Sequence, residues 1–426
     1  MRCTSITIIL LLLFSQSIAQ DKVDLEKYWN YRDNLTSKFL IIGTEPGMSL
    51  PAAYRNEVNR EIKWADNMIT LGWYIGVLAT EYHLLNNDKY TGYELNNKLR
   101  VSQNKYELYC ALLALRRLDE SAETSFRTSL GKSNQTVNRN GFMIRDDVPE
   151  NFHEKFPNIT NSQSDFSADN DFNKEMSQDQ IYHILMGLAL VKRFIPKEVE
   201  YEGVNFVKEA QKQAELISWY LSKYKWRIKN PLKFSEKRKL KSVDRGHQAY
   251  IFSGGIKKAV KYINDGDVNL VKKISPFYAW YWNTLRRCWN PTYTKQHNVH
   301  MIMSAASAGN GWNKRTSKTL IKLSHKHEWY AYPLIHESIF NSKYRGRWIK
   351  KKKAVDTYAL RDIKSAPAEG IRSPYPNRFE HKWSTNMKYI RDLKTQYTGR
   401  IHSQNRTYNG LDFMLLFNSY YITRYP

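Results

Sequence analysis

The chain has 426 residues, of which 42% are hydrophobic and 14% aromatic, so it can bury a sizeable core, which argues against global disorder. Its formal net charge of +25 predicts attraction to polyanions such as nucleic acids, anionic cell surfaces or acidic polysaccharides. Three cysteines are too few for a disulfide framework, so the fold must depend on its apolar core.

The N-terminus is typical of a cleavable secretory signal. Arg2 precedes an apolar run over 6–14, and the small residues Ser17 and Ala19 mark a cleavage site. The apolar run is too short to span a bilayer, and no later run is long enough. We therefore expect a signal peptide over 1–19 and a secreted or periplasmic mature domain over 20–426. Export argues against nucleic acid as the partner, and we expect no stable insertion into a membrane.

Apolar residues at three- and four-residue spacing dominate the rest of the chain, which predicts helices. In chain order, the expected helices cover 62–85, 106–118, 177–194, 203–224, 250–263, 297–308, 316–323, 330–340, 383–393 and 411–422. Ser177 is an expected helix cap, and only 39–42 has the pattern of a strand. The sequence therefore predicts an all-α fold with few or no strands. Neighbours such as 62–85 and 106–118 are expected to pair as helical hairpins.

The longest stretch without a helical pattern covers about 131–176, and it is acidic. Nine carboxylates against two lysines lie between Asp146 and Asp179. Loops of this length in compact domains usually have a function or are disordered. Because calcium takes several hard oxygens from a flexible loop, one hypothesis is a calcium site. The alternative is a solvated acidic loop without a cofactor. The ligands of that site would be Asp165, Asp169, Asp171 and Glu175.

Several polar and aromatic motifs accompany the helices. They are Gly72-Trp73-Tyr74, Arg145-Asp146-Asp147, Ser177-Gln178-Asp179-Gln180, Asp244-Arg245-Gly246-His247, His327-Glu328-Trp329-Tyr330 and Tyr408-Asn409-Gly410-Leu411-Asp412. With its export signal and helical hairpins, the chain resembles the six-hairpin (α/α) toroids that are common among bacterial glycoside hydrolases and polysaccharide lyases. The resemblance implies a toroid, a polysaccharide ligand and catalytic acids on loops at one end of the barrel.

Four carboxylates are candidates for glycoside hydrolysis. That reaction needs one carboxyl group to protonate the leaving oxygen and another to activate water or attack the sugar. We expect the pair to come from Asp146, Asp147, Asp179 and Glu328. Repulsion between adjacent acids can raise the pKa of one of them toward the value that a general acid needs. The alternative is structural: a solvated turn at Asp146, and Asp179 in the first turn of a helix capped by Ser177.

A polysaccharide lyase is the second hypothesis, and the excess of positive charge favours it. In a lyase, His247 or His327 would act as a neutral base and remove the proton beside a uronic carboxylate. Arg245 would bind that carboxylate. The alternative for this motif is a capped helix start with a structural Arg–Asp pair.

Other side chains suit sugar binding, because flat aromatic faces stack on sugar rings and amides bond hydroxyls. The third hypothesis is a glycan-binding or surface protein without catalysis. Aromatic residues at helical spacing can equally be core packing. The expected binding residues are Trp73, Arg145, Gln178, Gln180, Arg245, Trp329 and Tyr330.

Overall fold

The computed structural model describes residues 22–56, 58, 60–64, 67–87, 97–129, 139–157, 159, 164–165, 176–223, 228, 256–266, 307–308, 320–325, 329–341, 347–370, 372–373 and 406–424. Within these ranges the fold is mostly helical with few, short strands, as the sequence predicts. None of the helices in this part of the chain combines the length and the hydropathy needed to cross a membrane.

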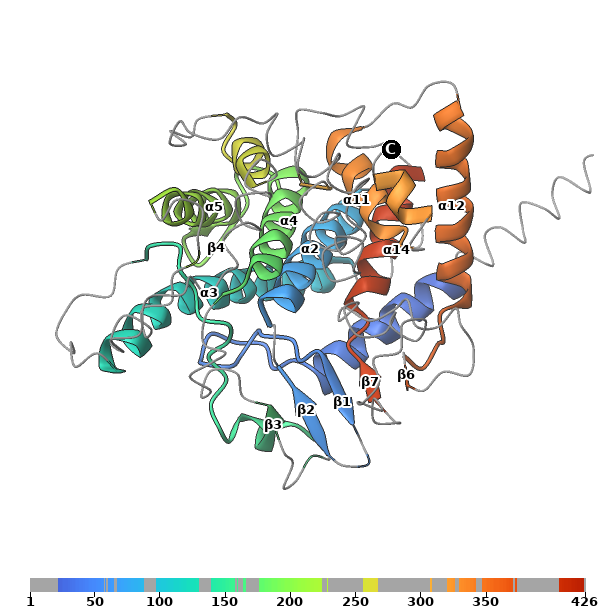
Figure 1. Ribbon diagram of the computed structural model, residues 1–426. Coiled ribbons are helices and arrows are strands. Elements are labelled where there is room, and N and C mark those ends of the chain that lie inside the picture. Colours follow the sequence, from blue (N-terminus) through green and yellow to red (C-terminus); the bar gives the residue numbers. More distant parts are fainter. Residues whose placement is uncertain are drawn as a thin grey trace, which may run out of the picture.

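Helices form the body of the molecule (Figure 1). The labelled helices are α2 (Asn67–Leu85), α3 (Asn97–Ser129), α4 (Gln178–Phe194), α5 (Phe206–Lys223), α11 (Ala331–Phe340), α12 (Arg347–Ser365) and α14 (Leu411–Arg424). Further helical stretches cover 22–38, 256–263 and 320–325. A single 3-10 turn, η1, covers Phe152–Lys155.

A small sheet lies at one end of the helical body (Figure 1). Its five strands run in the order β3-β2-β1-β7-β6. β1 is antiparallel to both β2 and β7. Tyr54 of β1 lies opposite Tyr408 of β7, so distant parts of the chain share one sheet. A separate ribbon of β4 and β5 leads into α5. The strands are β1 (Tyr54–Asn56), β2 (Glu61–Lys63), β3 (Ser164–Asp165), β4 (Glu200–Tyr201), β5 (Val204–Asn205), β6 (Arg372–Ser373) and β7 (Arg406–Tyr408).

The few strands expected from the sequence are present, but not where the sequence placed them. The stretch 39–42 is not a strand, and the helix expected over 62–85 begins only at Asn67 because β2 precedes it. Strands of two or three residues are too short to show a period in the sequence. The helices at 22–38 and α12 were not expected. The helices expected at 383–393 and, apart from its last two residues, at 297–308 lie outside the described residues.

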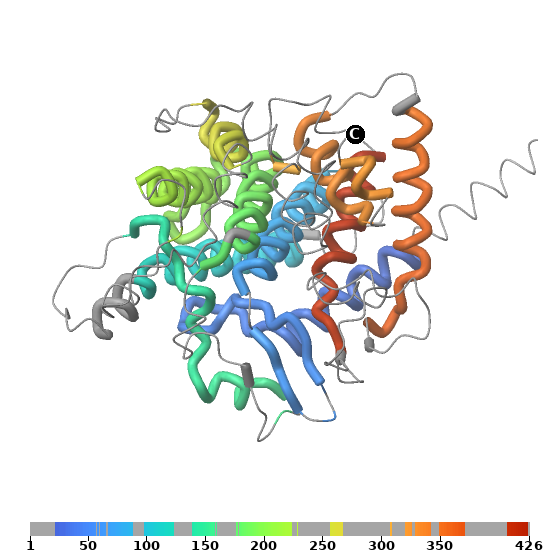
Figure 2. Tube along the Cα trace, in the orientation of Figure 1, coloured from blue at the N-terminus to red at the C-terminus, as the bar shows by residue number. Residues whose placement is uncertain are grey.

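Helix α2 is the centre of the helical body and lies between α4 and α14 (Figures 1 and 2). All of its residues except His83 are buried, as expected for a helix that is apolar on every side. A Cβ on Gly72 would lie 2.4 Å from the carbonyl oxygen of His183, and a Cβ on Gly187 would lie 2.4 Å from that of Gly72. The backbones of α2 and α4 therefore touch, which only glycine permits.

Helices α2, α4 and α14 run in the same direction. Gly76 lies against Leu190 of α4 and Leu415 of α14. One turn further along both α2 and α14, the Asn418 amide donates to Thr80 Oγ1 at 3.0 Å. On α4, Gly187, which touches Gly72, likewise comes before Leu190, which touches Gly76. Three helices that are distant in sequence thus form a parallel inner group.

The helix that follows α2 returns along its outside. The Tyr74 hydroxyl donates to Glu107 Oε2 at 2.6 Å, and the Asn104 amide donates to the carbonyl oxygen of Leu78 at 3.1 Å. The later residue of α2 contacts the earlier residue of α3, so the two helices are antiparallel. Helix α5 packs on α4 in the same way that α3 packs on α2, as the next helix in the chain. These are the two hairpins that the sequence predicts.

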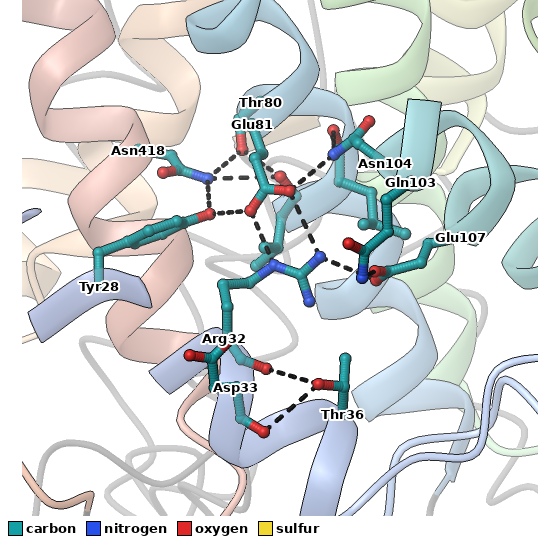
Figure 3. Close-up of polar contacts among 12 residues, drawn as sticks. Tyr28, Arg32, Asp33, Thr36, Thr80, Glu81, Gln103, Asn104, Glu107 and Asn418 are labelled. Carbon is teal, nitrogen blue, oxygen red and sulfur yellow. Dashed lines mark hydrogen bonds and ion pairs between the residues drawn. The ribbon is translucent and has the colours of Figure 1, made fainter. Parts of the chain in front are cut away.

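A buried polar network joins the 22–38 helix to the inner group (Figure 3). Arg32 donates from Nε to Glu81 Oε2 and from Nη2 to Glu107 Oε2, each at 2.8 Å. Tyr28 donates to the same Glu81 oxygen at 2.5 Å and accepts from the Asn418 amide at 3.1 Å. We call these side chains, with those of Tyr74 and Asn104, the Arg32 network.

Charge compensation dominates this network. Burial lowers the pKa of Arg32, but attraction by Glu107 and Glu81 outweighs it and holds that pKa well above its ordinary value. Burial and the neighbouring Glu107 carboxylate raise the pKa of Tyr74 well above its ordinary value. Arg32 therefore stays charged and Tyr74 stays a hydrogen-bond donor. Both properties suit a structural brace between helices.

Candidate functional site

Four aromatic side chains from α2, α4 and the start of α11 meet inside the helical body. The Trp73 ring lies 6.2 Å from the His183 ring and 5.7 Å from the Tyr332 ring, centroid to centroid. Trp329 lies 6.2 Å from Tyr332. All four are at most 3% exposed. We call them the Trp73 cluster; Trp73 and Trp329 were expected from the sequence, and the other two were not.

The hydrogen bonds of His183 determine its tautomer. Its Nδ1 lies 2.6 Å from the carbonyl oxygen of Asp179, which can only accept, so Nδ1 carries a proton. In the neutral ring Nε2 is then an acceptor, and it lies 3.4 Å from the hydroxyl of Tyr332. The cluster therefore places the Nε2 atom of His183 beside a phenol hydroxyl.

The buried polar atoms without a hydrogen-bond partner among the described residues include Nε1 of Trp73 and Oδ2 of Asp412. Trp73 is 1% exposed and Asp412 is 2% exposed. Because an unsatisfied buried polar group is costly, each such group in a native fold requires an explanation.

Asp412 lies in the first turn of α14. Asp412 lies three residues before Leu415 on α14, and Trp73 lies three residues before Gly76 on α2. Leu415 packs on Gly76. The packing of α14 on α2 therefore brings the turn that contains Asp412 beside the turn that contains Trp73. Burial raises the pKa of Asp412 well above its ordinary value, although backbone N–H groups, including that of Phe413 at 3.0 Å, act in the opposite direction. Such a carboxyl group keeps its proton to a higher pH than a solvated one.

The structure brings two of the expected carboxylates onto adjoining segments. The backbone N–H of Met176 donates to the carbonyl oxygen of Met143 at 3.0 Å. Asp179 follows Met176 by three residues, and Asp146 follows Met143 by three residues. Asp146 is fully buried and Asp179 is 5% exposed. The side chain of Asp179 accepts from the hydroxyl of Ser177. Asp146 therefore does not lie in the solvated turn that was its structural alternative, whereas Asp179 lies in the first turn of a helix capped by Ser177, as its structural alternative predicted.

Asp147 has a different environment from its neighbour. Its carboxylate pairs with the guanidinium of Arg117 and accepts the backbone N–H of Gly47 at 3.0 Å. The same guanidinium also donates to the carbonyl oxygens of Thr44 at 2.7 Å and Met48 at 2.9 Å. Asp147 thus holds the loop around 43–48 against α3. These bonds give it a structural task.

Several expected binding residues have their positions at the helix ends. Gln180 is fully buried, and its Oε1 accepts the backbone N–H of Ser177 at 2.8 Å, so it completes a capping box at the start of α4. Arg145 is half-buried beside Asp146. Tyr330 stacks on Tyr358 of α12 at 5.4 Å.

The remaining candidates lie outside the described residues, in whole or in their side chains. Within the described part of the chain, no group of three or more His, Cys, Asp or Glu side chains could hold a metal ion. Asp165 lies in β3, but its side chain is not described. The others are Arg245, His247, His327, Glu328, Asp169, Asp171, Glu175 and the side chain of Gln178.

Sequence reasoning missed His183, Tyr332 and Asp412 as parts of this region. A signal existed for each. His183 lies one helical turn after Asp179 and so shares its face. Tyr332 follows Trp329 at a spacing that continues the aromatic run, and Asp412 ends one of the motifs that carry the toroid resemblance.

Comparisons of the chain with family models, with curated proteins and with solved structures find no match.

Proposed function

We propose that the protein is an exported glycoside hydrolase with an (α/α) toroid fold, and that its reaction centre is the Trp73 cluster with the acids around it. The parallel inner helices α2, α4 and α14, with α3 and α5 returning outside, support the toroid. The export signal in 1–19 supports the localisation.

The observation that carries the proposal is the buried Asp412 carboxyl group, whose pKa burial raises and whose turn of α14 packs beside the turn of α2 that contains Trp73. A carboxyl group with a raised pKa can protonate the leaving glycosidic oxygen. Asp179 or Asp146 would supply the second carboxylate, as general base or nucleophile. Trp73 would offer its indole N–H to a sugar oxygen, and the rings of Trp73 and Tyr332 would offer apolar faces.

The enclosed position of these groups sets a condition for catalysis. Trp73 and Asp412 are almost fully buried, so the surrounding chain must open for a sugar to reach them. The test therefore measures turnover in addition to binding.

The test is incubation of the mature protein with neutral and acidic polysaccharides while new reducing ends are measured. Asp412→Asn and Asp179→Asn should each lower kcat by about 10²–10⁴-fold, as expected for loss of a catalytic acid or base. Glu154→Gln, at an exposed acid of η1, is the matched control and should keep full activity. Full activity of both aspartate variants would overturn the assignment, and circular dichroism would confirm that they fold.

A polysaccharide lyase is the second candidate, and the His183–Tyr332 pair favours it. A neutral histidine nitrogen and a phenol 3.4 Å apart could share the removal of a proton beside a uronic carboxylate. New reducing ends accompanied by the ultraviolet absorbance of an unsaturated uronide would indicate a lyase. Tight binding to a glycan without any product would instead indicate a binding protein.

A further inference from the structure

The outward face of α12 carries only positive charge. Lys350, Lys353 and Lys364 are exposed and make no ion pair with the described residues, and Arg361 is partly exposed. On a helix of 3.6 residues per turn these four positions form one stripe, about 21 Å long from end to end. We call it the α12 basic stripe. No carboxylate is exposed on α12.

The acids of α12 point inward and are neutralised there. Asp356 accepts from Lys352 Nζ at 2.7 Å and pairs with Arg424 Nη2 at 3.2 Å. Asp362 is 5% exposed and pairs with Arg361 at 3.0 Å. The fold therefore buries both acids of this helix. Arg361 of the stripe is paired with Asp362, whereas Lys350, Lys353 and Lys364 present their charges to solvent.

An ordered aromatic side chain lies beside the stripe. Tyr358 is 36% exposed, its ring stacks on Tyr330 at 5.4 Å, and the Arg361 guanidinium lies 4.9 Å from its centroid. The His325 ring meets Tyr358 edge-on at 6.0 Å. These contacts hold Tyr358 in place at the surface, so it offers a fixed apolar face.

The stripe is connected to the proposed reaction centre through the start of α11. Tyr330 contacts Tyr358, whereas Trp329 and Tyr332, on either side of it in sequence, belong to the Trp73 cluster. One short segment thus links an outward basic surface with the interior cluster.

We propose that the α12 basic stripe, with Tyr358, binds an acidic polysaccharide, and that the substrate of the proposed hydrolase is anionic. This inference rests on the proposed function for its second clause. Charge complementarity identifies the occupant: cations along one helix face match the carboxylate or sulfate groups of a hydrated chain, and Tyr358 stacks on a sugar ring.

The same face does not suit a lipid surface. A helix that lies on a membrane needs an apolar face toward the acyl chains. The apolar side of α12, with Val355, Ala359 and Ile363, is fully buried against the core. Among the described side chains of α12, Ile349 and Tyr358 are the exposed large apolar ones, too few for a membrane-binding face, so the exposed side favours a hydrated polyanion.

The experiment compares two triple variants of the full chain. Lys350→Gln/Lys353→Gln/Lys364→Gln removes the stripe, and Lys197→Gln/Lys208→Gln/Lys212→Gln removes the same charge from exposed positions on α5 and the turn before it. Binding to polygalacturonate, heparin and neutral dextran is measured by titration calorimetry at low salt. The stripe variant should bind the acidic chains about tenfold more weakly, and the α5 variant should bind them as the unchanged protein does.

A second variant pair tests the aromatic contribution. Tyr358→Ala should also weaken binding, whereas Tyr106→Ala, at a tyrosine of similar exposure on α3, should not. Unfolding curves of both variants verify that they remain folded at the temperature of the titration.

The outcomes separate this proposal from the proposed function. Equal losses in the two triple variants, or no loss in either, would overturn the docking surface whether or not the protein cleaves glycans. Loss of binding to vesicles of anionic phospholipid or to single-stranded DNA, without loss for acidic polysaccharide, would also overturn it. Selective loss for acidic chains with no cleavage of any glycan would support the surface and reject the hydrolase.

Discussion

Trp73 and Tyr74 are neighbours on α2, yet they belong to buried polar regions of opposite character. Tyr74 is part of the Arg32 network, where the guanidinium is paired with two carboxylates (Figure 3). Trp73 belongs to the Trp73 cluster; Asp412, on the turn of α14 that packs beside it, has no basic partner among the described residues, and burial raises its pKa. In the first arrangement the buried charges compensate one another, so that removing one of them is costly. The second costs stability, and such a cost is expected to persist only where function requires it.

The largest expected effect on stability comes from removing the charge of Arg32, the cation at the centre of the Arg32 network. Arg32→Met would leave Glu81 and Glu107 buried without their counter-charge, so the free energy of unfolding should fall by about 3–5 kcal/mol. Urea unfolding followed by circular dichroism measures it.

The matched control for that variant is an exposed pair. Arg116→Met removes the partner of Glu120 on the surface of α3, and it should cost no more than about 0.5 kcal/mol. If the two arginine variants lose the same stability, the Arg32 network is not the brace that its geometry indicates.

The contact between α2 and α4 should be nearly as sensitive. In Gly187→Ala the new methyl group would meet the carbonyl oxygen of Gly72, so we expect a loss of about 1–3 kcal/mol and displacement of Trp73 from His183. Turnover should fall with it. Gly203→Ala, at a turn with nothing near the added methyl group, is the comparison; it should lose stability through its positive φ alone and keep its turnover.

The effect of Asp412 should be seen as a dependence of stability on pH. Because its pKa is raised in the folded state, the folded chain binds more protons than the unfolded chain above the ordinary aspartate value of about 3.9. Stability is therefore greatest below that value and falls as the pH rises toward the folded pKa, by up to about 1.4 kcal/mol per pH unit.

Asp412→Asn removes this titration. The difference in unfolding free energy between the variant and the unchanged protein should therefore vary as the pH rises from about 4 to about 8. Urea titrations at several pH values across this range measure it. A constant difference for Asp412→Asn would show that its carboxyl group is not perturbed.

The sequence predicted the helices that have strong apolar periods and missed those that do not. The start of α4 at Ser177 was predicted because a cap and a long apolar period coincide there. The short strands were missed because their pairing is between distant segments, as for Tyr54 with Tyr408. α12 was missed because its run of lysines obscures a buried face of Val355, Ala359 and Ile363.

The candidate site shows a similar limit. Asp146 and Asp179 could be chosen as acids in advance, because their motifs are visible in the sequence. That Asp147 pairs with Arg117 could not, since the two are separated by a long loop. Nor could the meeting of Trp73 with His183, which depends on the contact of two glycine-containing helix faces. Such contacts arise from tertiary packing and leave no local pattern.

The most direct test of the account is a side-by-side measurement on the neighbouring pair. Tyr74→Phe and Trp73→Phe are compared for unfolding free energy and for kcat/KM on whichever polysaccharide the protein cleaves. Tyr74→Phe should lose about 1.5–3 kcal/mol, because Glu107 loses a buried donor, and should keep its kcat/KM. Trp73→Phe should lose at least about tenfold in kcat/KM while it remains folded. Full activity of Trp73→Phe, or losses of activity in both variants that follow their losses of stability, would contradict the division between a structural network and a functional cluster.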